Sequence, residues 1–313
     1  MRRTATLASL VLLSVVAWCA PAPPEVGDVR IRVPVWLAPG TDPAGVSVFR
    51  AAIGGVSSKI LSVKRPGDDL LLIIALDMTQ DLTQATLAKQ ALVAEIGNLP
   101  PNAAVAVMRA QDSLKVLADP TTVRATVAGA INSLPISGKA GLLDTVESLG
   151  RTGDAILRRS AVRVAILYVT DSDIQNYREN FTNPVVNSSD TRDLSRKFPE
   201  ALIQDKIAKL VPILAGRQAP MFVVHLRYRS DRLGEAYQNG LKQLAEVTGG
   251  SAIFCRSSEE IADAIHRAIG LIVSHYCVTL ALPERAPKAF QVQLDAGKNW
   301  GLSYRTRFVV KER

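Results

Sequence analysis

The fold of this chain is decided by the stretch Leu70-Leu71-Leu72-Ile73-Ile74-Ala75-Leu76-Asp77-Met78-Thr79-Gln80-Asp81. Seven apolar residues run without alternation and then give way to polar ones. A strand with one face in water alternates apolar and polar side chains, so this run indicates a strand buried on both faces, as in a parallel sheet covered by helices. In such sheets ligands bind at the carboxyl ends of the strands. We therefore look for the functional site at Asp77, Thr79 and Asp81.

Strand-like and helix-like segments alternate from this stretch to residue 274. Besides the first strand, the patterns predict strands at 103–110, 115–118, 162–169, 221–226 and 251–255, and helices at 81–97, 122–134, 140–150, 199–214, 232–247 and 257–274. Ser257 is the predicted N-cap of the last helix, with Glu260 as its capping-box partner. Gly249 suits a left-handed C-cap. This alternation predicts a doubly wound α/β domain with a mostly parallel sheet.

The two ends of the chain have β patterns instead. Residues 29–37 alternate, and the apolar runs 46–53 and 56–63 lie on either side of Gly54-Gly55, a typical hairpin turn. At the other end, 275–282, 290–294 and 302–310 also resemble short strands. We expect these small β segments to pack on each other.

The first residues are typical of an export signal. Arg2 and Arg3 precede an apolar core from Leu7 to Ala17, which has the length of a signal peptide and not of a membrane span. We expect a signal peptide over 1–22 and a periplasmic or extracellular protein. Cys19 offers lipoprotein anchoring as an alternative, although the bulky Trp18 before it argues against a lipoprotein box. No later stretch is long and apolar enough for a transmembrane helix.

The composition is that of a globular protein with an aliphatic core. Of 313 residues, 48% are hydrophobic, 21% are charged and only 5% are aromatic, with a net charge of +8 spread along the chain. No platform of basic and aromatic residues accompanies this charge, so nucleic-acid binding is not predicted. Cys255 and Cys277 either pair in an exported protein or act as small buried hydrophobes, and both alternatives stay open.

Two strand ends present carboxylates. Asp77 ends the first strand, and Asp171 follows another buried strand in Thr170-Asp171-Ser172-Asp173. If the two strands are neighbours, their loops meet and offer oxygen ligands to a hard cation. Alternatively, these acids cap the helices that follow them.

The order of Leu70–Asp81, Val162–Asp173 and Thr248-Gly249-Gly250 resembles a von Willebrand factor type A domain. The similarity is greatest to the secreted bacterial subgroup in which β segments flank that domain. The resemblance implies a von Willebrand A or Rossmann-like domain at 69–274 between an N-terminal β segment at 27–65 and a C-terminal one at 275–313.

That family carries a metal-ion-dependent adhesion site, made by an Asp-x-Ser-x-Ser loop, a Thr and a further Asp. The matching positions in this chain are Asp77, Thr79, Asp81, Ala140 and Asp171. Asp81 replaces the second Ser, and Ala140 falls where the family has its Thr. The resemblance therefore implies either a site that binds Mg²⁺ or another divalent cation through Asp77, Thr79, Asp81 and Asp171, or a degenerate site that binds none.

The resemblance implies a non-catalytic, secreted protein-binding or scaffold module with a role such as cell adhesion. Its expected contact surface comprises the loops 77–81 and 137–141, with Lys139, and the polar segment 172–198, with Ser172 and Asp173. Its partner is a protein of unknown identity. The alternative is a metal-dependent hydrolase or phosphatase that uses Asp77 and Asp171. Against it, Thr79 stands where aspartate-nucleophile phosphatases need a second acid, and no phosphate-binding glycine loop is present.

Overall fold

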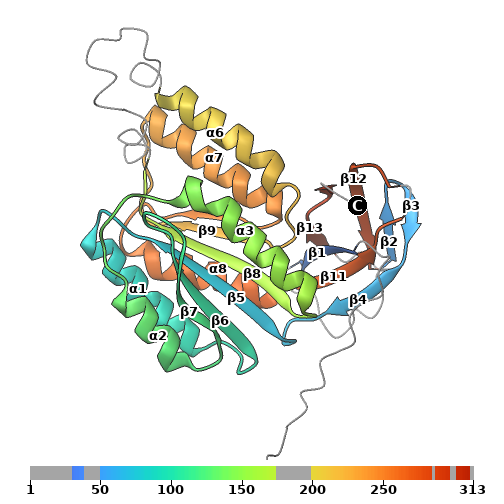
Figure 1. Cartoon of the computed structure of the whole chain (residues 1–313), viewed down its shortest axis with the longest axis horizontal. Helices are drawn as coiled ribbons and strands as arrows, with labels where there is room; N and C mark the ends of the chain where they lie inside the picture. Colours follow the sequence, from blue (N-terminus) through green and yellow to red (C-terminus); the bar gives the residue numbers. More distant parts are fainter. Residues whose placement is uncertain (1–29, 39–49, 174–198, 284–285, 297–300, 311–313) are drawn as a thin grey trace, which may run out of the picture.

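The computed structural model describes residues 30–38, 50–173, 199–283, 286–296 and 301–310 (Figure 1). The predicted signal peptide, Cys19 and the segment 174–198 lie outside these residues. Among the described helices, none is long and apolar enough to cross a membrane.

A six-stranded sheet with the order β10-β9-β8-β5-β6-β7 forms the centre of the molecule. Its strands are β5 (Leu70–Asp77), β6 (Ala103–Arg109), β7 (Lys115–Thr121), β8 (Arg163–Thr170), β9 (Met221–His225) and β10 (Ala252–Phe254). All neighbours pair in parallel except β7, which runs antiparallel to β6 at one edge. Every residue of β5 is buried, which confirms the predicted strand with both faces covered.

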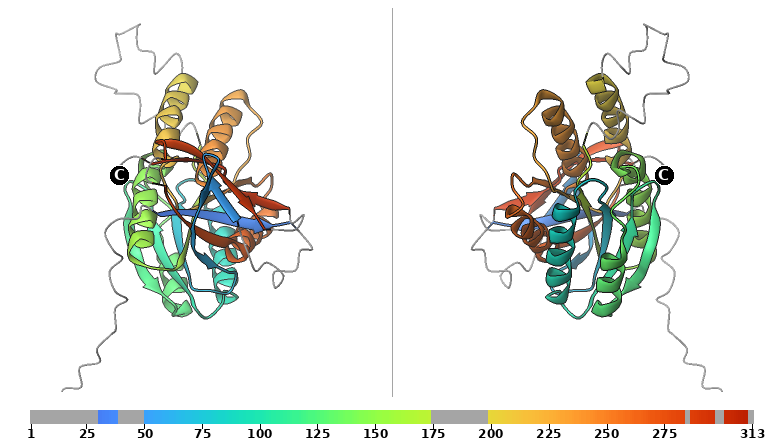
Figure 2. Two further views of the ribbon diagram at one scale, coloured as in Figure 1. Left: turned by 90° about the vertical axis from the view of Figure 1, so that its right-hand side faces the viewer. Right: turned by 90° about the vertical axis from the view of Figure 1, so that its left-hand side faces the viewer.

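Helices cover both faces of this sheet (Figures 1 and 2). One face carries α1 (Leu82–Gly97), α2 (Arg124–Ser133) and α8 (Glu260–Ser274), and the other carries α3 (Leu142–Arg159), α6 (Pro199–Leu214) and α7 (Arg232–Thr248). Alternate residues of β5 divide between the two cores: Leu72 and Ile74 pack toward α1 and α8, whereas Leu71 and Ile73 pack toward α3 and α6. The predicted doubly wound α/β fold is confirmed.

Some predicted helix boundaries differ from the observed ones. Helix α8 begins at Glu260 with Glu259 as its N-cap, so the predicted N-cap at Ser257 is wrong. The Ser257 hydroxyl instead donates to the Glu259 carboxylate at 2.6 Å, because residues 256–259 form bends and turns before the helix. Helix α3 continues to Arg159, nine residues past the predicted end at 150. Gly249 is the left-handed C-cap of α7, as predicted, with φ of 93°.

The β segments at the two ends of the chain form two packed sheets. One has the order β13-β1-β11-β4 and the other β14-β12-β2-β3. The strands are β1 (Arg30–Leu37), β2 (Arg50–Ile53), β3 (Val56–Ser58), β4 (Ile60–Lys64), β11 (Tyr276–Ala281), β12 (Ala289–Asp295), β13 (Leu302–Tyr304) and β14 (Arg307–Val309). Each sheet takes strands from both ends of the chain, so the expected mutual packing is present. The runs 56–63 and 302–310 each split into two strands, because the chain passes there from one sheet to the other.

The two cysteines of the described chain are free and buried. Cys255 packs in the core beneath α8, whereas Cys277 lies in β11 opposite Pro34 and Lys64. The alternative of a disulfide is therefore wrong, and both residues act as small buried hydrophobes.

Candidate functional site at the carboxyl edge of the sheet

The sheet register brings the two strand-end carboxylates together. Strands β5 and β8 pair in parallel with Asp77 opposite Thr170, so Asp171 follows directly beside the end of β5. The Asp171 amide donates to the Asp77 carbonyl at 3.2 Å. The two loops meet at one place because the strands are neighbours.

Asp77 binds the start of α3. Its side chain is fully buried, and its carboxylate accepts from the Gly141 amide at 3.1 and 3.2 Å and from the Leu142 amide at 3.1 Å. The Thr170 hydroxyl donates to it at 3.2 Å. These amides are unpaired donors at a helix N-terminus, where a negative charge is favourable. Burial raises the pKa of Asp77 to about 7, against the lowering effect of the Gly141 amide, and the charge of Asp171 raises it further.

Asp171 is held by three successive backbone amides of the loop after β5. Its Oδ1 accepts from the Thr79 amide at 2.8 Å, and its Oδ2 accepts from the Gln80 and Asp81 amides at 2.8 and 3.0 Å. The side chain is 2% exposed. Successive amides of this kind form a concave anion site. In this chain the anion that occupies it is the chain's own carboxylate.

Asp81 caps α1, since its side chain accepts from the Gln84 amide at 3.0 Å. The alternative that Asp77 and Asp171 cap the helices that follow them is wrong for Asp171, which accepts from amides of the loop before α1. Asp77 caps a helix too, but α3 and not the one that follows it.

The loop before α3 packs tightly against the loop after β6. A side chain at Gly141 would place its Cβ 1.8 Å from the Ala110 carbonyl oxygen, so this position requires glycine. The Ala140 side chain is buried in the core beneath α3. Lys139 is exposed, and its amide donates to the Asp112 carboxylate at 2.8 Å.

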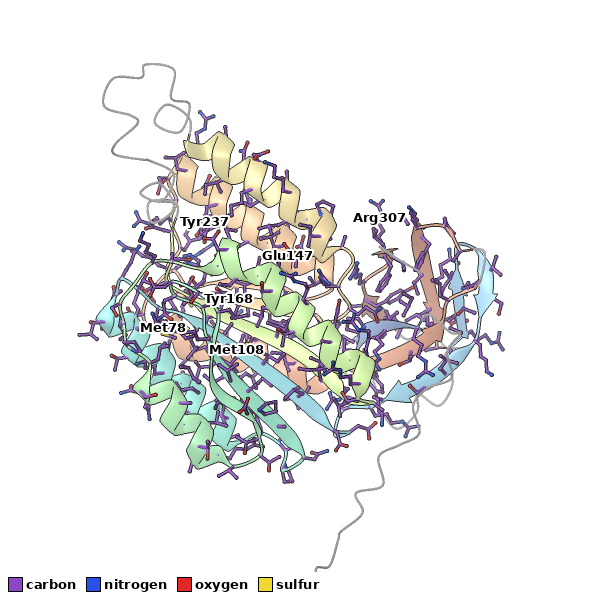
Figure 3. All side chains as sticks on the ribbon, in the orientation of Figure 1. Met78, Met108, Glu147, Tyr168, Tyr237 and Arg307 are labelled. Carbon is purple, nitrogen blue, oxygen red and sulfur yellow. The ribbon has the colours of Figure 1, made fainter. Side chains whose placement is uncertain are left out.

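A buried polar network continues from Asp77 toward α7. The Thr170 hydroxyl lies 2.7 Å from that of Ser172, which lies 3.1 Å from the hydroxyl of Tyr237. His225 Nδ1 accepts from the Arg227 amide at 3.2 Å, so its Nε2 is the donor to the Ser172 carbonyl, at 2.6 Å. Figure 3 shows Tyr237 on α7, together with Tyr168 on β8.

Ser172 and Asp173, predicted to contact a partner, have buried side chains. Asp173 pairs with Arg229 at 2.6 Å. Tyr237, His225 and Arg229 belong to this network, yet the sequence contained no signal for them, because each comes from an element after the segment 174–198.

The acids at this edge all accept hydrogen bonds from backbone amides. The carboxylates of Asp77 and Asp171 accept from backbone amides, Asp81 turns toward α1, and the Thr79 hydroxyl lies 3.4 Å from Asp171. Among the described residues, no three His, Cys, Asp or Glu side chains are grouped to hold a metal ion.

No protein-family model and no curated protein sequence matches this chain. Its fold is similar to several solved structures. One is the von Willebrand factor domain of the type V pili tip protein Mfa5 from Porphyromonas gingivalis, at 14% identity and a TM-score of 0.45 over 66% of this chain and 95% of the other. Another is the VWA domain of SpRpn10, at 13% identity and a TM-score of 0.39 over 64% and 95%. A third is an aerotolerance-related membrane protein from Bacteroides fragilis, at 16% identity and a TM-score of 0.39 over 64% and 98%. Sequence identities and TM-scores this low indicate nothing about activity or partners.

Proposed function

We propose that this chain is a non-catalytic protein-binding or scaffold module of the von Willebrand A type, exported from a bacterial cell, with a degenerate metal site. It binds its partner with the carboxyl edge of the sheet and without a resident cation. The observation that carries this proposal is the use of Asp171, whose carboxylate binds three amides of the neighbouring loop.

This arrangement supports a rigid recognition surface. Asp77 ties β5 to the start of α3, and Asp171 ties β8 to the loop before α1. Two acids that would otherwise be cation ligands thus hold the loops in fixed positions. Loops fixed on a rigid sheet are a usual place for recognition.

The exposed residues beside these acids form the proposed contact surface. Leu82, the first residue of α1, is 68% exposed although it is large and apolar. Gln80, on the loop that leads into α1, and Lys139, on the loop before α3, are also exposed. We propose this exposed leucine as the apolar contact of the surface. We leave Ser172 and Asp173 out of this surface because their side chains are buried.

The hydrolase alternative has less support. A nucleophilic Asp77 would have to reach a substrate, but its side chain is 0% exposed and its oxygens accept from Gly141 and Leu142. Asp171 is held in the same way by amides. Asp77 and Asp171 are 0% and 2% exposed.

The surface is tested by cross-linking and capture from the native cell envelope, with full-length wild type, Leu82→Glu and Lys139→Glu. Val123→Glu is the matched control, because Val123 is 56% exposed and lies after β7, at the opposite end of the sheet. We expect Leu82→Glu to reduce capture of a specific protein about tenfold or more, as loss of an interface anchor does. Unchanged capture by both carboxyl-edge variants would contradict the proposal.

Whether the carboxyl edge binds a divalent cation is tested by calorimetric titration and by the melting temperature of the protein with Mg²⁺, Mn²⁺ and Ca²⁺. We expect no binding heat and no shift in melting temperature, and we expect chelation with EDTA to leave partner capture unchanged. Micromolar binding that disappears in both Asp77→Ala and Asp171→Ala would instead establish a working cation site and overturn the degenerate one.

A further inference from the structure

The positive charge of this chain is concentrated in the β sandwich, the two packed sheets formed by the ends of the chain. Its described residues, up to 69 and from 275 onward, include nine Lys and Arg and three Asp and Glu. The described residues of the α/β domain between them include eighteen Lys and Arg and eighteen Asp and Glu. The cations in excess are spread along the sequence, but the fold brings both ends of the chain together and so gathers them in the sandwich.

Most cations of the sandwich are not used inside the protein. Arg32 and Arg305 are exceptions, since they donate to backbone carbonyls. Every ion pair between two described residues lies within 95–267, in the α/β domain. The exposed cations of the sandwich therefore form no ion pair with a described acid, and their charge is open to a partner.

Three of these exposed cations, Arg30, Arg50 and Lys59, lie at one end of the sandwich, around the end of β11. Arg30 is opposite Ala281 in the register, and the Ala281 amide donates to the Lys59 carbonyl at 2.9 Å. The Ser58 hydroxyl donates to the Ala281 carbonyl at 2.7 Å, and the register partner of Ser58 in β2 is the residue after Arg50. The backbone thus holds the three cations at the same end of both sheets.

The C-terminal end of α3 adds Arg158 and Arg159 to this end of the sandwich. Both residues are exposed. Arg32 of β1 donates to the carbonyl of Ser160, the residue after α3, at 3.1 Å, and Figure 1 shows this end of the helix beside the sandwich. Because Arg32 is two residues from Arg30 in the same strand, the two groups of cations lie at one junction.

The basic end, as we call it, comprises Arg30, Arg50, Lys59, Arg158 and Arg159. Asp154 and Asp295 are described acids near it. Asp154 is buried and pairs with Arg217 at 3.5 Å, and Asp295 lies opposite Arg50 in the register. These acids do not cancel five exposed cations, so the basic end has a positive potential.

Cations presented in this way suit a broad surface with many anionic groups. They come from β1, from β2, from the turn between β3 and β4, and from the end of α3, so they are spread over one end of the molecule. An anionic bilayer attracts each Lys or Arg near its surface and needs no shaped pocket. The place of the basic end in the chain also favours a bilayer, because Arg30 follows the segment that holds the predicted signal peptide.

We propose that the basic end binds the surface of a bilayer that contains anionic phospholipids. Its guanidinium and ammonium groups bind the phosphates of several lipids at once. Helix α3 begins at the carboxyl edge, where the Leu142 amide binds Asp77, and ends at the basic end. The carboxyl-edge surface therefore stays accessible to a protein partner while the chain lies on the bilayer. This contact goes beyond the proposed function, since the two surfaces share no residue.

Co-sedimentation with vesicles tests this proposal. The full-length chain is mixed with vesicles of phosphatidylglycerol and phosphatidylethanolamine in equal parts, and separately with vesicles of phosphatidylcholine. Binding to phosphatidylcholine measures any insertion of the apolar segment 7–17, which needs no anionic lipid. We expect an affinity for the anionic vesicles that is about tenfold or more higher. This difference should disappear as the salt concentration rises from about 0.1 M to about 1 M, where the Debye length falls from about 10 Å to about 3 Å.

Two variants locate the contact. Arg30→Gln/Arg50→Gln/Lys59→Gln should reduce the affinity for the anionic vesicles about tenfold or more, because three cations near the lipid phosphates are lost. Arg158→Gln/Arg159→Gln should reduce it independently. All five positions are exposed, so the substitutions keep the fold, which the melting temperature verifies.

The matched control is Lys115→Gln/Lys139→Gln/Arg227→Gln, which removes three exposed cations from the α/β domain and should change the affinity by less than about threefold. An equal loss in this control and in the triple variant of the basic end would overturn the proposal. So would equal binding to anionic and phosphatidylcholine vesicles. Binding to heparin or poly-glutamate, which are soluble polyanions, without binding to the anionic vesicles would overturn it as well.

Discussion

Three aspartates at the carboxyl edge of the sheet bind three different groups. Asp77 holds the start of α3, Asp171 holds the loop after β5, and Asp81 caps α1. Their differences come from what each one faces and not from the residue type. Asp171 has the largest set of backbone donors, so it is the residue whose loss should cost most.

Asp171→Ala should lower the free energy of unfolding by about 2–4 kcal/mol, because it leaves the amides of Thr79, Gln80 and Asp81 without their acceptor. Urea denaturation measures this loss. Asp205→Ala, which removes a 58% exposed carboxylate on α6, is the control and should change the free energy by less than about 0.5 kcal/mol. Equal effects of the two substitutions would show that the amide cradle does not stabilise the fold.

At the scale of elements, buried and half-buried arginines join the β sheets to the ends of the helices. Arg32 of β1 donates to the Ser160 carbonyl at the end of α3 at 3.1 Å, and Arg305 donates to the Arg217 carbonyl just after α6 at 2.6 Å. Arg163, at the start of β8, donates to the Val273 and His275 carbonyls at 2.9 and 3.0 Å. Cations near the C-termini of helices are favourable, since unpaired carbonyls gather there. The β sheets thus attach to the end of the domain opposite the candidate site.

Arg163→Met should lower the free energy of unfolding by about 2–4 kcal/mol, because one buried and two partly buried carbonyls lose their donor while the volume is roughly kept. Amide hydrogen exchange should also quicken around residues 273–277, where α8 passes into β11. Arg267→Met, at a 56% exposed position on α8, is the control. Unchanged exchange at this junction would contradict a role for Arg163 in holding it.

At the scale of the whole molecule, stability depends on groups that are buried in their neutral form. His275 is 1% exposed, and its Nδ1 lies 2.6 Å from the Ile272 carbonyl. Burial lowers the pKa of His275 to about 4, and the charge of Arg163 lowers it further. Burial likewise lowers the pKa of His225. Asp77 has the opposite effect on stability. Because its pKa is raised in the folded state, the free energy of unfolding gains from Asp77 as the pH falls below about 7, whereas it loses from the histidines.

The contribution of neutral His275 to the free energy of unfolding should therefore be complete above pH 6.5 and be lost as the pH falls toward 4. Over this range the histidine of the unfolded chain binds a proton, whereas that of the folded chain does not. Between pH 7.5 and pH 4.5, wild type should lose about 2–3 kcal/mol relative to His275→Asn, in which the asparagine keeps a hydrogen-bonding group near Ile272. Urea denaturation at both pH values measures the difference. A difference that does not change with pH would show that His275 does not titrate between the two states.

The sequence by itself determined what depends on local pattern. The unbroken apolar run of β5 predicted a strand with both faces covered, and the position of Asp77 after it predicted where the loops would meet. Gly249 predicted the end of α7 for a local reason too, because the left-handed conformation favours glycine.

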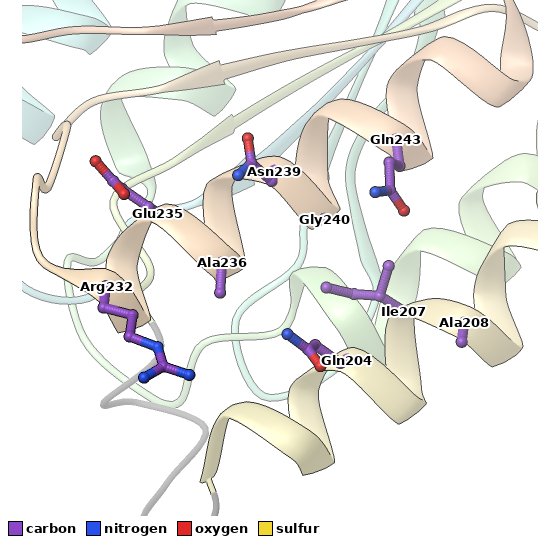
Figure 4. A pocket seen from close by; sticks show the side chains of 9 residues that line it. All are labelled: Gln204, Ile207, Ala208, Arg232, Glu235, Ala236, Asn239, Gly240 and Gln243. Atoms are coloured by element: carbon purple, nitrogen blue, oxygen red, sulfur yellow. The ribbon is translucent and has the colours of Figure 1, made fainter.

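Only the tertiary structure decided which group each side chain binds. The partners of Asp171 are about 90 residues away in the chain, and those of Asp77 are 64 and 65 residues away. The Ser172 hydroxyl lies 3.1 Å from that of Tyr237, 65 residues later in the chain, and Gly240 of α7 lies close against Ile207 of α6 (Figure 4). Hydrogen bonds and packing act over a few ångströms of space, and only the folded chain sets which distant residues lie within that range.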